Sequence, residues 1–383
     1  MKYNVILMIL FLFQLQSLAQ SKDFEKFTLL GRIADYDTGK LILTAGFITE
    51  DYIKPFKPQS TSIKKGKFSF QGSINYPEAA RVLFNPNSNN PLLSSLFFIR
   101  KGTQTVSFDT DSFSINPILN NGKESREYKN CYLKKMTDVT MEESNMFHKI
   151  DSLYNFYNNK LPDKIEIIVA ELKKLIQRKK DSVLINYVKQ YPDSYVSMWL
   201  LVERFCMNGY NEMYYQAANL LSKRIKELYT TKQLIKKFQL AKQTDLGNIL
   251  PLKYIVTNKN ALLFNSIKHN KYTLIDFWYS HCGPCLEQFP EFKTIYLLYK
   301  KSGFEIASIS VDQKKDEQNF KDIIKKYGLH WQQFWDINGN KSRGVSINSF
   351  PTNFLLDSNG IIIKKNISPS QLELFLKEEF NKL

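Results

Sequence analysis

The sequence predicts an α/β domain at the C-terminus, preceded by an all-β sandwich-like domain and an α-helical linking region. Three observations predict this division. Short alternating strands occupy residues 24–115, a helical period runs through residues 124–242, and a buried strand leads into the sequence Cys-Gly-Pro-Cys at residues 282–285. With 383 residues, of which 43% are hydrophobic, the chain is long enough for two or three domains with substantial cores.

Residues 1–19 are expected to be a signal peptide. Lys2 is followed by an apolar run over residues 5–13, and Ser17 and Ala19 supply the small residues of a cleavage site. The run is shorter than the roughly 20 residues that span a bilayer. No cysteine follows it directly, which argues against a lipid anchor. The mature chain is therefore expected to be a soluble periplasmic protein, with an uncleaved anchor as the alternative.

The formal net charge of +16 comes mainly from lysine. The sequence has no basic block interleaved with aromatic residues and no recognition-helix pattern, so we expect no nucleic-acid partner. A lysine-rich, solvated surface accounts for the charge, and weak attraction to anionic membranes or acidic partners is the alternative.

Residues 20–122 are expected to form the β-rich domain. Turns at Asp37-Thr38-Gly39 and Lys65-Gly66-Lys67 separate short alternating segments. The predicted strands are 27–33, 40–47, 67–72, 80–84, 96–100 and 105–108. Residues 65–72 (Lys-Gly-Lys-Phe-Ser-Phe-Gln-Gly) resemble the small β domain of unknown role of the DUF4369 type. The segment has no catalytic constellation, so binding or placement is its expected role.

Residues 123–245 are expected to form four or five linking helices. One apolar stripe with helical spacing contains Ile165, Ile168, Val169, Leu172, Leu175 and Ile176. Pro192-Asp193-Ser194 begins another helix, which Asn208-Gly209 ends. Cys131 and Cys206 fall in this region, where they either pair with each other or remain buried thiols.

Cys282 and Cys285 carry the strongest chemical signal of the chain. The strand 274–278 precedes them, so the first thiol lies at a helix N-terminus, where unpaired N–H groups stabilise a thiolate. Two thiols at this spacing can form and break a small disulfide ring, which is the chemistry of thiol–disulfide exchange. Zinc would need four ligands, but the other two cysteines are isolated and the four histidines are unpaired. We therefore expect no metal.

Residues 246–383 resemble a thioredoxin-fold domain of the TlpA-like thiol–disulfide oxidoreductase type. The resemblance rests on the two cysteines and on Asp276, Pro290, the strand 304–312, the helix 316–327 and Ser349-Phe350-Pro351-Thr352. It implies a redox-active pair Cys282–Cys285, a buried Asp276 that assists deprotonation of Cys285, and a cis-proline Pro351 that shapes the substrate groove. The implied substrate-binding residues are Trp278, Gly283, Pro284, Phe350 and Thr352.

Three positions depart from the family pattern. His281 replaces the usual Trp before the first cysteine, and it is either a solvated loop residue or a group that lowers the pKa of Cys282. Gln288 stands where many relatives have Glu, so a carboxylate role there is in doubt. Ser308 falls where thioredoxins often place Lys, so Asp276 is expected to lack a cationic partner and to have a raised pKa.

The resemblance implies an exported oxidoreductase, without a cofactor, that reduces disulfides in client proteins of the cell envelope. Cys282, expected to be exposed, would attack the client, and the partly shielded Cys285 would resolve the mixed disulfide. A membrane-bound thiol donor would supply the electrons. The alternatives are a disulfide oxidase or isomerase, and a binding protein with an auxiliary thioredoxin domain. A peroxiredoxin-type peroxidase is disfavoured because it would require Pro and Thr at Ile275 and Tyr279.

Overall fold

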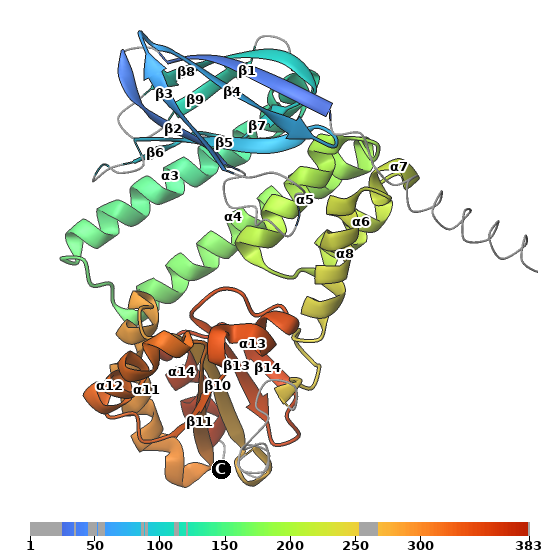
Figure 1. Cartoon of the computed structure of the whole chain (residues 1–383). Helices are drawn as coiled ribbons and strands as arrows, with labels where there is room; N and C mark the ends of the chain where they lie inside the picture. The colour runs from blue at the N-terminus through green and yellow to red at the C-terminus, as the bar shows by residue number, and fades with distance from the viewer. Residues whose placement is uncertain are drawn as a thin grey trace, which may run out of the picture. The chain divides into compact units, whose positions relative to one another are not determined.

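The computed structural model describes residues 25–33, 36–44, 52, 58–85, 88, 91–110, 115–119, 122–252 and 267–381. The predicted signal peptide, residues 1–19, lies outside them. The chain divides into two compact units, each built from two stretches (Figure 1). The first unit comprises Met1–Asn145 with Ile176–Leu234, and the second comprises Met146–Leu175 with Ile235–Leu383.

The first unit contains a nine-stranded sheet with the hydrogen-bonded order β6-β5-β2-β3-β4-β1-β8-β9, and β7 pairs with β5 beside this path. The strands are β1 (Glu25–Ile33), β2 (Thr38–Thr44), β3 (Gln59–Lys64), β4 (Lys67–Ile74), β5 (Glu78–Phe84), β6 (Leu92–Leu93), β7 (Phe97–Ile99), β8 (Gly102–Thr110) and β9 (Ile115–Leu119). β1 pairs with β8 in parallel, and the other pairs are antiparallel.

The two halves of this sheet face each other as layers, as the sandwich-like prediction requires (Figure 1). They join at the β3–β4 hairpin, where Lys64 pairs with Lys67 and the strands then separate. Leu29 from one half and Leu41 from the other are completely buried. At Gly31 a Cβ atom would lie 1.8 Å from the ring of Phe68, so only glycine fits beneath that ring.

Residues 123–242 are helical, as predicted, in more pieces than expected. They form α2 (Lys123–Glu127), the π-helix η2 (Tyr128–Leu133), α3 (Lys134–Phe156), α4 (Asp163–Gln190), α5 (Tyr195–Asn208), α6 (Glu212–Leu220), α7 (Lys223–Lys226) and α8 (Tyr229–Lys242). Ser194 caps α5 by accepting from Val196 and Ser197 N–H, and Gly209 ends the helix with φ 74°. No helix in the described ranges is long and apolar enough to cross a membrane.

Side chains of α5 fasten this helix to the sheet of the first unit. Trp199 is completely buried and donates from Nε1 to the carbonyl of Pro77 at 2.9 Å. Arg81 of β5 forms an ion pair with Glu203 and also donates to the carbonyl of Ser94. Polar groups at the interface are thus paired, which offsets the free-energy cost of burying them.

The apolar stripe noted in the sequence of α4 is only partly buried. Val169 and Ile176 are buried, whereas Ile168, Leu172 and Leu175 are exposed. Val169 packs with Ile150 and Leu161 in a small cluster, and residues one helical position away point about 100° from it.

The second unit is built on a five-stranded sheet with the order β12-β11-β10-β13-β14. The strands are β10 (Tyr272–Trp278), β11 (Phe304–Ser310), β12 (Gln332–Trp335), β13 (Thr352–Asp357) and β14 (Ile362–Lys365). β10, β11 and β12 run parallel, and β13 and β14 are antiparallel to their neighbours. The helices are α11 (Gly283–Tyr299), α12 (Glu317–Tyr327), α13 (Asn340–Gly344) and α14 (Pro369–Phe380), with short 3₁₀ turns at Lys300–Ser302, Lys314–Asp316 and Ile337–Gly339.

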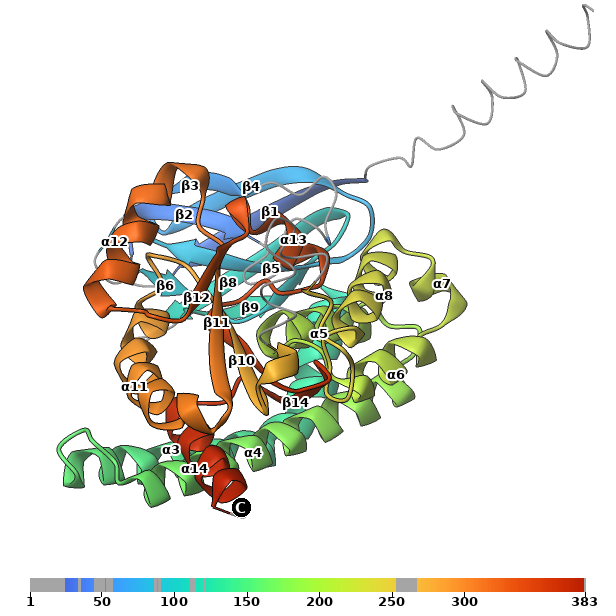
Figure 2. The same cartoon turned by 90° about the horizontal axis from the view of Figure 1, so that it is seen from below.

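The side chains of β10 alternate between two hydrophobic clusters. Leu274 and Trp278 join the cluster that contains residues of α11, α12 and α14, and Ile275 and Phe277 join the cluster on the opposite face. Figure 2 shows α11 and α12 on one side of β10 and β11. Asp276 lies between Leu274 and Trp278 in this alternation, so its side chain is on the α11 face.

Candidate active site

Cys282 and Cys285 form a disulfide at the start of α11. Cys282 is the N-cap of this helix, and its Sγ accepts a hydrogen bond from the Cys285 N–H at 3.2 Å. The helix therefore directs its N-terminal N–H groups toward this sulfur, as expected for a cysteine whose thiolate is to be stabilised. The prediction that Cys282 is exposed is wrong, because it is 3% exposed and Cys285 is 2% exposed. Both pack into the cluster of the α11 face.

The loop before Cys282 is held by Asp312, which follows β11 and is buried. Its carboxylate accepts from the N–H of Ser280 at 2.9 Å and from the Ser280 hydroxyl at 2.7 Å. Ser310 donates to the other carboxylate oxygen at 2.7 Å. The backbone two residues before Cys282 is therefore fixed by charge-assisted hydrogen bonds.

Asp276 is 2% exposed on the middle strand of the sheet. Burial raises the pKa of Asp276 to about 7, and a hydrogen bond from Ser308 opposes that rise. Ser308 pairs with Asp276 across β10 and β11 and donates to its Oδ2 at 3.4 Å. The expectation of a raised pKa without a cationic partner is confirmed in direction, and the carboxyl group can exchange a proton near neutral pH.

The peptide bond between Phe350 and Pro351 is cis, as predicted, and it lies directly before β13. Phe350 is partly buried against the cluster that contains the disulfide, and its ring meets that of Tyr279 edge-on at 5.7 Å between centroids. Thr352 is buried and donates from its hydroxyl to the carbonyl of Ser349 at 2.7 Å. Thr352 thus supports this turn, and its predicted contact with substrate stays a prediction.

Trp278 is completely buried, and its predicted contact with substrate stays a prediction. Its ring packs edge-on against Phe289 of α11 at 5.1 Å, within the cluster that also holds the disulfide. Gly283 and Pro284, in contrast, are exposed in the first turn of α11. Of the predicted substrate-binding residues, the solvent-accessible ones are therefore Gly283 and Pro284, which are exposed, and Phe350, which is half-buried.

The departures from the family pattern occupy different environments. The His281 side chain is 61% exposed and lies 3.5 Å from Asp316 and 3.2 Å from Asn319 through its Nε2 atom. These contacts suit a solvated loop residue. Gln288 lies one turn after Cys285, and its buried Oε1 has no hydrogen-bond partner among the described residues.

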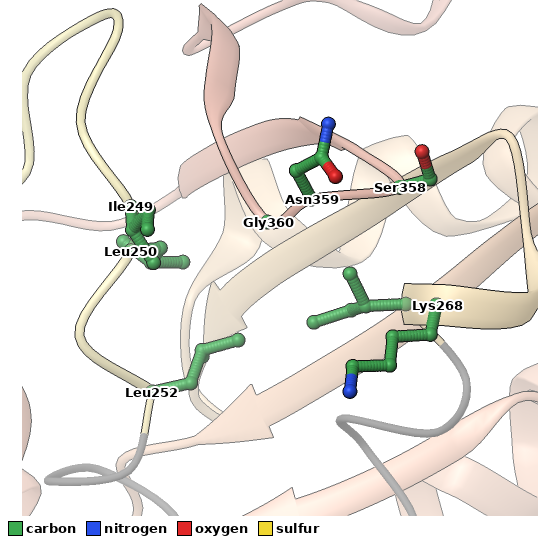
Figure 3. Close-up of a pocket in the computed structure, with 8 residues that line it drawn as sticks. Ile249, Leu250, Leu252, Lys268, Ser358, Asn359 and Gly360 are labelled. Atoms are coloured by element: carbon green, nitrogen blue, oxygen red, sulfur yellow. The ribbon is translucent and has the colours of Figure 1, made fainter.

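A pocket of about 480 Å³ lies at the opposite end of β10 from the cysteines (Figure 3). Its lining residues are Ile249, Leu250, Leu252, Ile267, Lys268, Ser358, Asn359 and Gly360. Among the described residues of this lining, Lys268 is the one charged side chain, and they offer no acid–base pair.

Cys131 and Cys206 both lie in the first unit, and the structure shows no disulfide between them. Cys131 lies in the π-helix η2, and its thiol forms a hydrogen bond with Tyr191. Of the two alternatives from the sequence, the pairing is absent, and both cysteines are thiols that are half-buried and not fully buried as expected.

The strand order, the helix that begins at Cys282 and the cis-proline before β13 together define a thioredoxin-like domain. A comparison with family models agrees, since residues 270–362 match the model described as thioredoxin-like. Residues 27–151 match the model of the domain of unknown function DUF4369, which extends past residue 122 into α3. Both resemblances found in the sequence are confirmed: the C-terminal part of the chain belongs to the thioredoxin-like family, and the N-terminal part belongs to the DUF4369 family.

The relatives of the C-terminal part are named as oxidoreductases. Thiol-disulfide oxidoreductase ResA of Bacillus cereus is 33% identical over 112 residues, which cover 28% of this chain and 63% of that protein. Sporulation thiol-disulfide oxidoreductase A of Bacillus subtilis is 29% identical over 102 residues, which cover 26% of this chain and 62% of that protein. The chain thus spans less than two thirds of the length of these relatives.

A solved structure of a thiol-disulfide oxidoreductase from Bacteroides fragilis is 35% identical. The match covers 29% of this chain and 82% of that one, with a TM-score of 0.27. All three similarities cover less than a third of the chain.

Two residues that support the site were not predicted from the sequence. In the sequence, Asp312 was identified only as the last residue of the predicted strand 304–312, and no pattern indicated Trp331. An acidic residue directly after a buried strand on the cysteine edge of the sheet is a signal that would have indicated Asp312. Trp331 gives no such signal, because its partner Ser308 is 23 positions away.

Proposed function

We propose that the protein is a thiol–disulfide oxidoreductase that reduces disulfides in client proteins of the cell envelope. One observation carries the proposal: the Cys282–Cys285 disulfide lies at the N-terminus of α11, on the sheet face that also holds Asp276. A dithiol, a helix N-terminus and a carboxyl group with a pKa near 7 are the groups that exchange requires. The names of the curated relatives support the same class of reaction.

In the reduced enzyme, the thiolate of Cys282 attacks one sulfur of the client disulfide. A mixed disulfide forms, and the first client sulfur leaves as a thiolate. Asp276 then accepts the proton of Cys285 through a bridging water, and the resulting thiolate attacks Sγ of Cys282. The second client sulfur leaves, so the client gains two electrons while Cys282 and Cys285 return to a disulfide.

The remaining residues act in binding and support. Gly283, Pro284 and Phe350 contact the client, and Pro351 shapes the groove in which it docks. Trp278 and Thr352 hold this surface from within the domain.

Export through residues 1–19 and reduction by a membrane-bound thiol donor complete the proposal. The proposed segments are a signal peptide at 1–19, a β domain at 20–122, a helical region at 123–245 and the redox domain at 246–383. A strand-rich and helical N-terminal half that belongs to the same chain as a redox domain suits a role in client selection.

The test is the reduction potential of the Cys282–Cys285 pair, measured in glutathione buffers on the chain with Cys131 and Cys206 replaced by Ser. A potential near or below about −250 mV supports a reductase. A potential between about −180 and −120 mV supports an oxidase or isomerase and reverses the direction of the reaction. Failure to form the disulfide in any buffer overturns the proposal in favour of a binding protein.

A further inference from the structure

Two neutral side chains lead to the carboxyl group of Asp276: Ser308 is hydrogen-bonded to Asp276, and Trp331 is hydrogen-bonded to Ser308. Ser308 is completely buried and lies 3.4 Å from Asp276 Oδ2 through its hydroxyl oxygen. Trp331, which precedes β12, places its Nε1 2.8 Å from the same hydroxyl oxygen. The three side chains therefore form a chain of hydrogen bonds inside the domain.

The hydrogen bonds in this series all run in one direction, from Trp331 through Ser308 to Asp276. An indole N–H donates and cannot accept, so the Ser308 oxygen is the acceptor of the bond from Trp331. The hydroxyl hydrogen of Ser308 is then left to donate onward, and Asp276 Oδ2 is the acceptor in reach. A proton placed on Oδ2 would leave that buried hydroxyl hydrogen without an acceptor, which is unfavourable for a group that water does not reach. A proton on Oδ1 has no such cost.

The other elements packed around Asp276 leave this arrangement undisturbed. On β13, Asn353 pairs with Asp276 in register, but its amide donates to the carbonyl of Ile367 at 3.0 Å and accepts from the Ile367 N–H at 2.9 Å. Both ends of the Asn353 amide are thus occupied. On α11, Cys285 is in the disulfide, and among the described residues no charged group acts on the Asp276 carboxyl.

Packing also fixes the orientation of the Trp331 indole, which is the hydrogen-bond donor to Ser308. Trp331 is 4% exposed, and its ring meets Tyr296 of α11 edge-on at 5.5 Å between centroids. The indole is therefore held in the orientation that directs Nε1 at Ser308.

We propose that Trp331 and Ser308 are positioning residues that fix the Asp276 carboxyl, so that Oδ1 is the oxygen that exchanges a proton with Cys285. The role of Asp276 as proton acceptor rests on the proposed function, whereas the orientation of its carboxyl group does not. We call these two neutral hydrogen-bonded side chains, Trp331 and Ser308, the relay. The relay occupies the place of the cationic partner that Asp276 lacks.

The test is a ¹³C NMR titration of the Asp276 carboxyl carbon in the full, oxidised chain. Ser308→Ala removes a hydrogen bond that favours the charged form, so the midpoint is expected to rise by about one pH unit. Trp331→Phe keeps the ring but frees the hydroxyl, and a smaller rise is expected. Ser308→Thr retains the hydroxyl and should restore the wild-type midpoint. A wild-type midpoint in both Ser308→Ala and Trp331→Phe overturns the relay.

Thiol exchange with a reporter disulfide separates the relay from the proposed function. If both hold, Ser308→Ala is several-fold slower than wild type at pH 7 and equal to it at pH 9, where Asp276 is ionised in both. If the wild-type protein shows no exchange, the proposed function fails, while the carboxyl titration still decides the relay. Should Ser308→Ala fail to fold, by circular dichroism, the titration of Trp331→Phe decides between the relay and its absence.

Discussion

The two sheets of this protein each bury a carboxyl group to the same extent. Asp276 in the C-terminal sheet and Glu78 at the start of β5 in the N-terminal sheet are both 2% exposed. Burial raises the pKa of Asp276 to about 7 and the pKa of Glu78 to about 8. Within the described parts of the chain, no neighbouring charge shifts the pKa of either group.

The surroundings of the two groups differ. Asp276 shares a sheet face with a disulfide and accepts from a buried hydroxyl. Glu78 accepts from the backbone of Asn75, and its Oε2 has no partner among the described residues. Burial alone is therefore enough to raise the pKa of a carboxyl group. Of these two groups, Asp276 is the one that shares a sheet face with a thiol pair with which it could exchange a proton.

The largest effect is expected at the cysteines. Cys282→Ser should lower reduction of a reporter disulfide by at least about 1,000-fold, because Cys282 forms the proposed mixed disulfide and Cys285 acts only on that intermediate. Cys285→Ser should instead trap mixed disulfides, visible on a non-reducing gel. The control is the double variant Cys131→Ser, Cys206→Ser, which should keep full activity. Loss of activity in that control would place part of the chemistry in the N-terminal unit.

The second prediction compares the two buried acids in stability. In each, the folded-state pKa exceeds the unfolded value, so the folded state binds more protons between the two values, and the free energy of unfolding falls as pH rises. The fall runs from about pH 4 through pH 7 for Asp276 and through pH 8 for Glu78.

Asp276→Asn and Glu78→Gln remove the titrating group. Each should raise the free energy of unfolding at pH 9 by up to about 4 kcal/mol and change it little at pH 4. Denaturant unfolding at both pH values measures this. Only Asp276→Asn should also change the pH profile of thiol exchange. An altered exchange profile in Glu78→Gln would remove the distinction between the two acids.

The third prediction concerns the loop before Cys282. Asp312→Ala leaves the Ser280 N–H and two hydroxyl groups without their acceptor, so the free energy of unfolding should fall by about 3 kcal/mol and exchange should slow. Asp357→Ala is the matched control, because Asp357 accepts from Asn359 and Ile361 N–H in the turn at the other end of the sheet. Equal slowing of exchange in the two variants would show a general loss of stability instead of a local one.

The smallest effect is expected at His281. Its side chain is exposed, and its contact with Asp316 is a surface pair of the kind that contributes about 0–1 kcal/mol. His281→Gln should therefore change the exchange rate by less than about threefold at pH 7. A larger loss that appears only below pH 7 would instead indicate that its charged form acts on Cys282.

The sequence predicted the elements whose signal is local. β1, β4, β10 and α12 all have the alternation, helical period or turn residues that predict them. β3 (Gln59–Lys64) was missed because Gln-Ser-Thr-Ser-Ile-Lys has one apolar residue, Ile63, and thus no alternating pattern. The π-helix at Tyr128–Leu133 gives no sequence signal that separates it from the α-helices on either side.

The candidate site was predicted in its residues but less well in its burial. The positions of Cys282, Cys285, Asp276 and Pro351 follow from a linear motif, whereas the exposure of Cys282 and Trp278 depends on what packs over them from other elements. The bond between Trp331 and Ser308 is likewise a product of the parallel pairing of β11 and β12, which no local pattern records.

The neutral surroundings of Asp276 have a consequence for how the protein responds to dissolved salt. Mobile ions weaken the interactions between separated charges, and they act weakly on buried groups. Burial and one hydroxyl group set the proton affinity of Asp276, and no charged group among the described residues contributes to it. The proposed acid–base step at the cysteines should therefore depend little on ionic strength, even though the chain carries a net charge of +16.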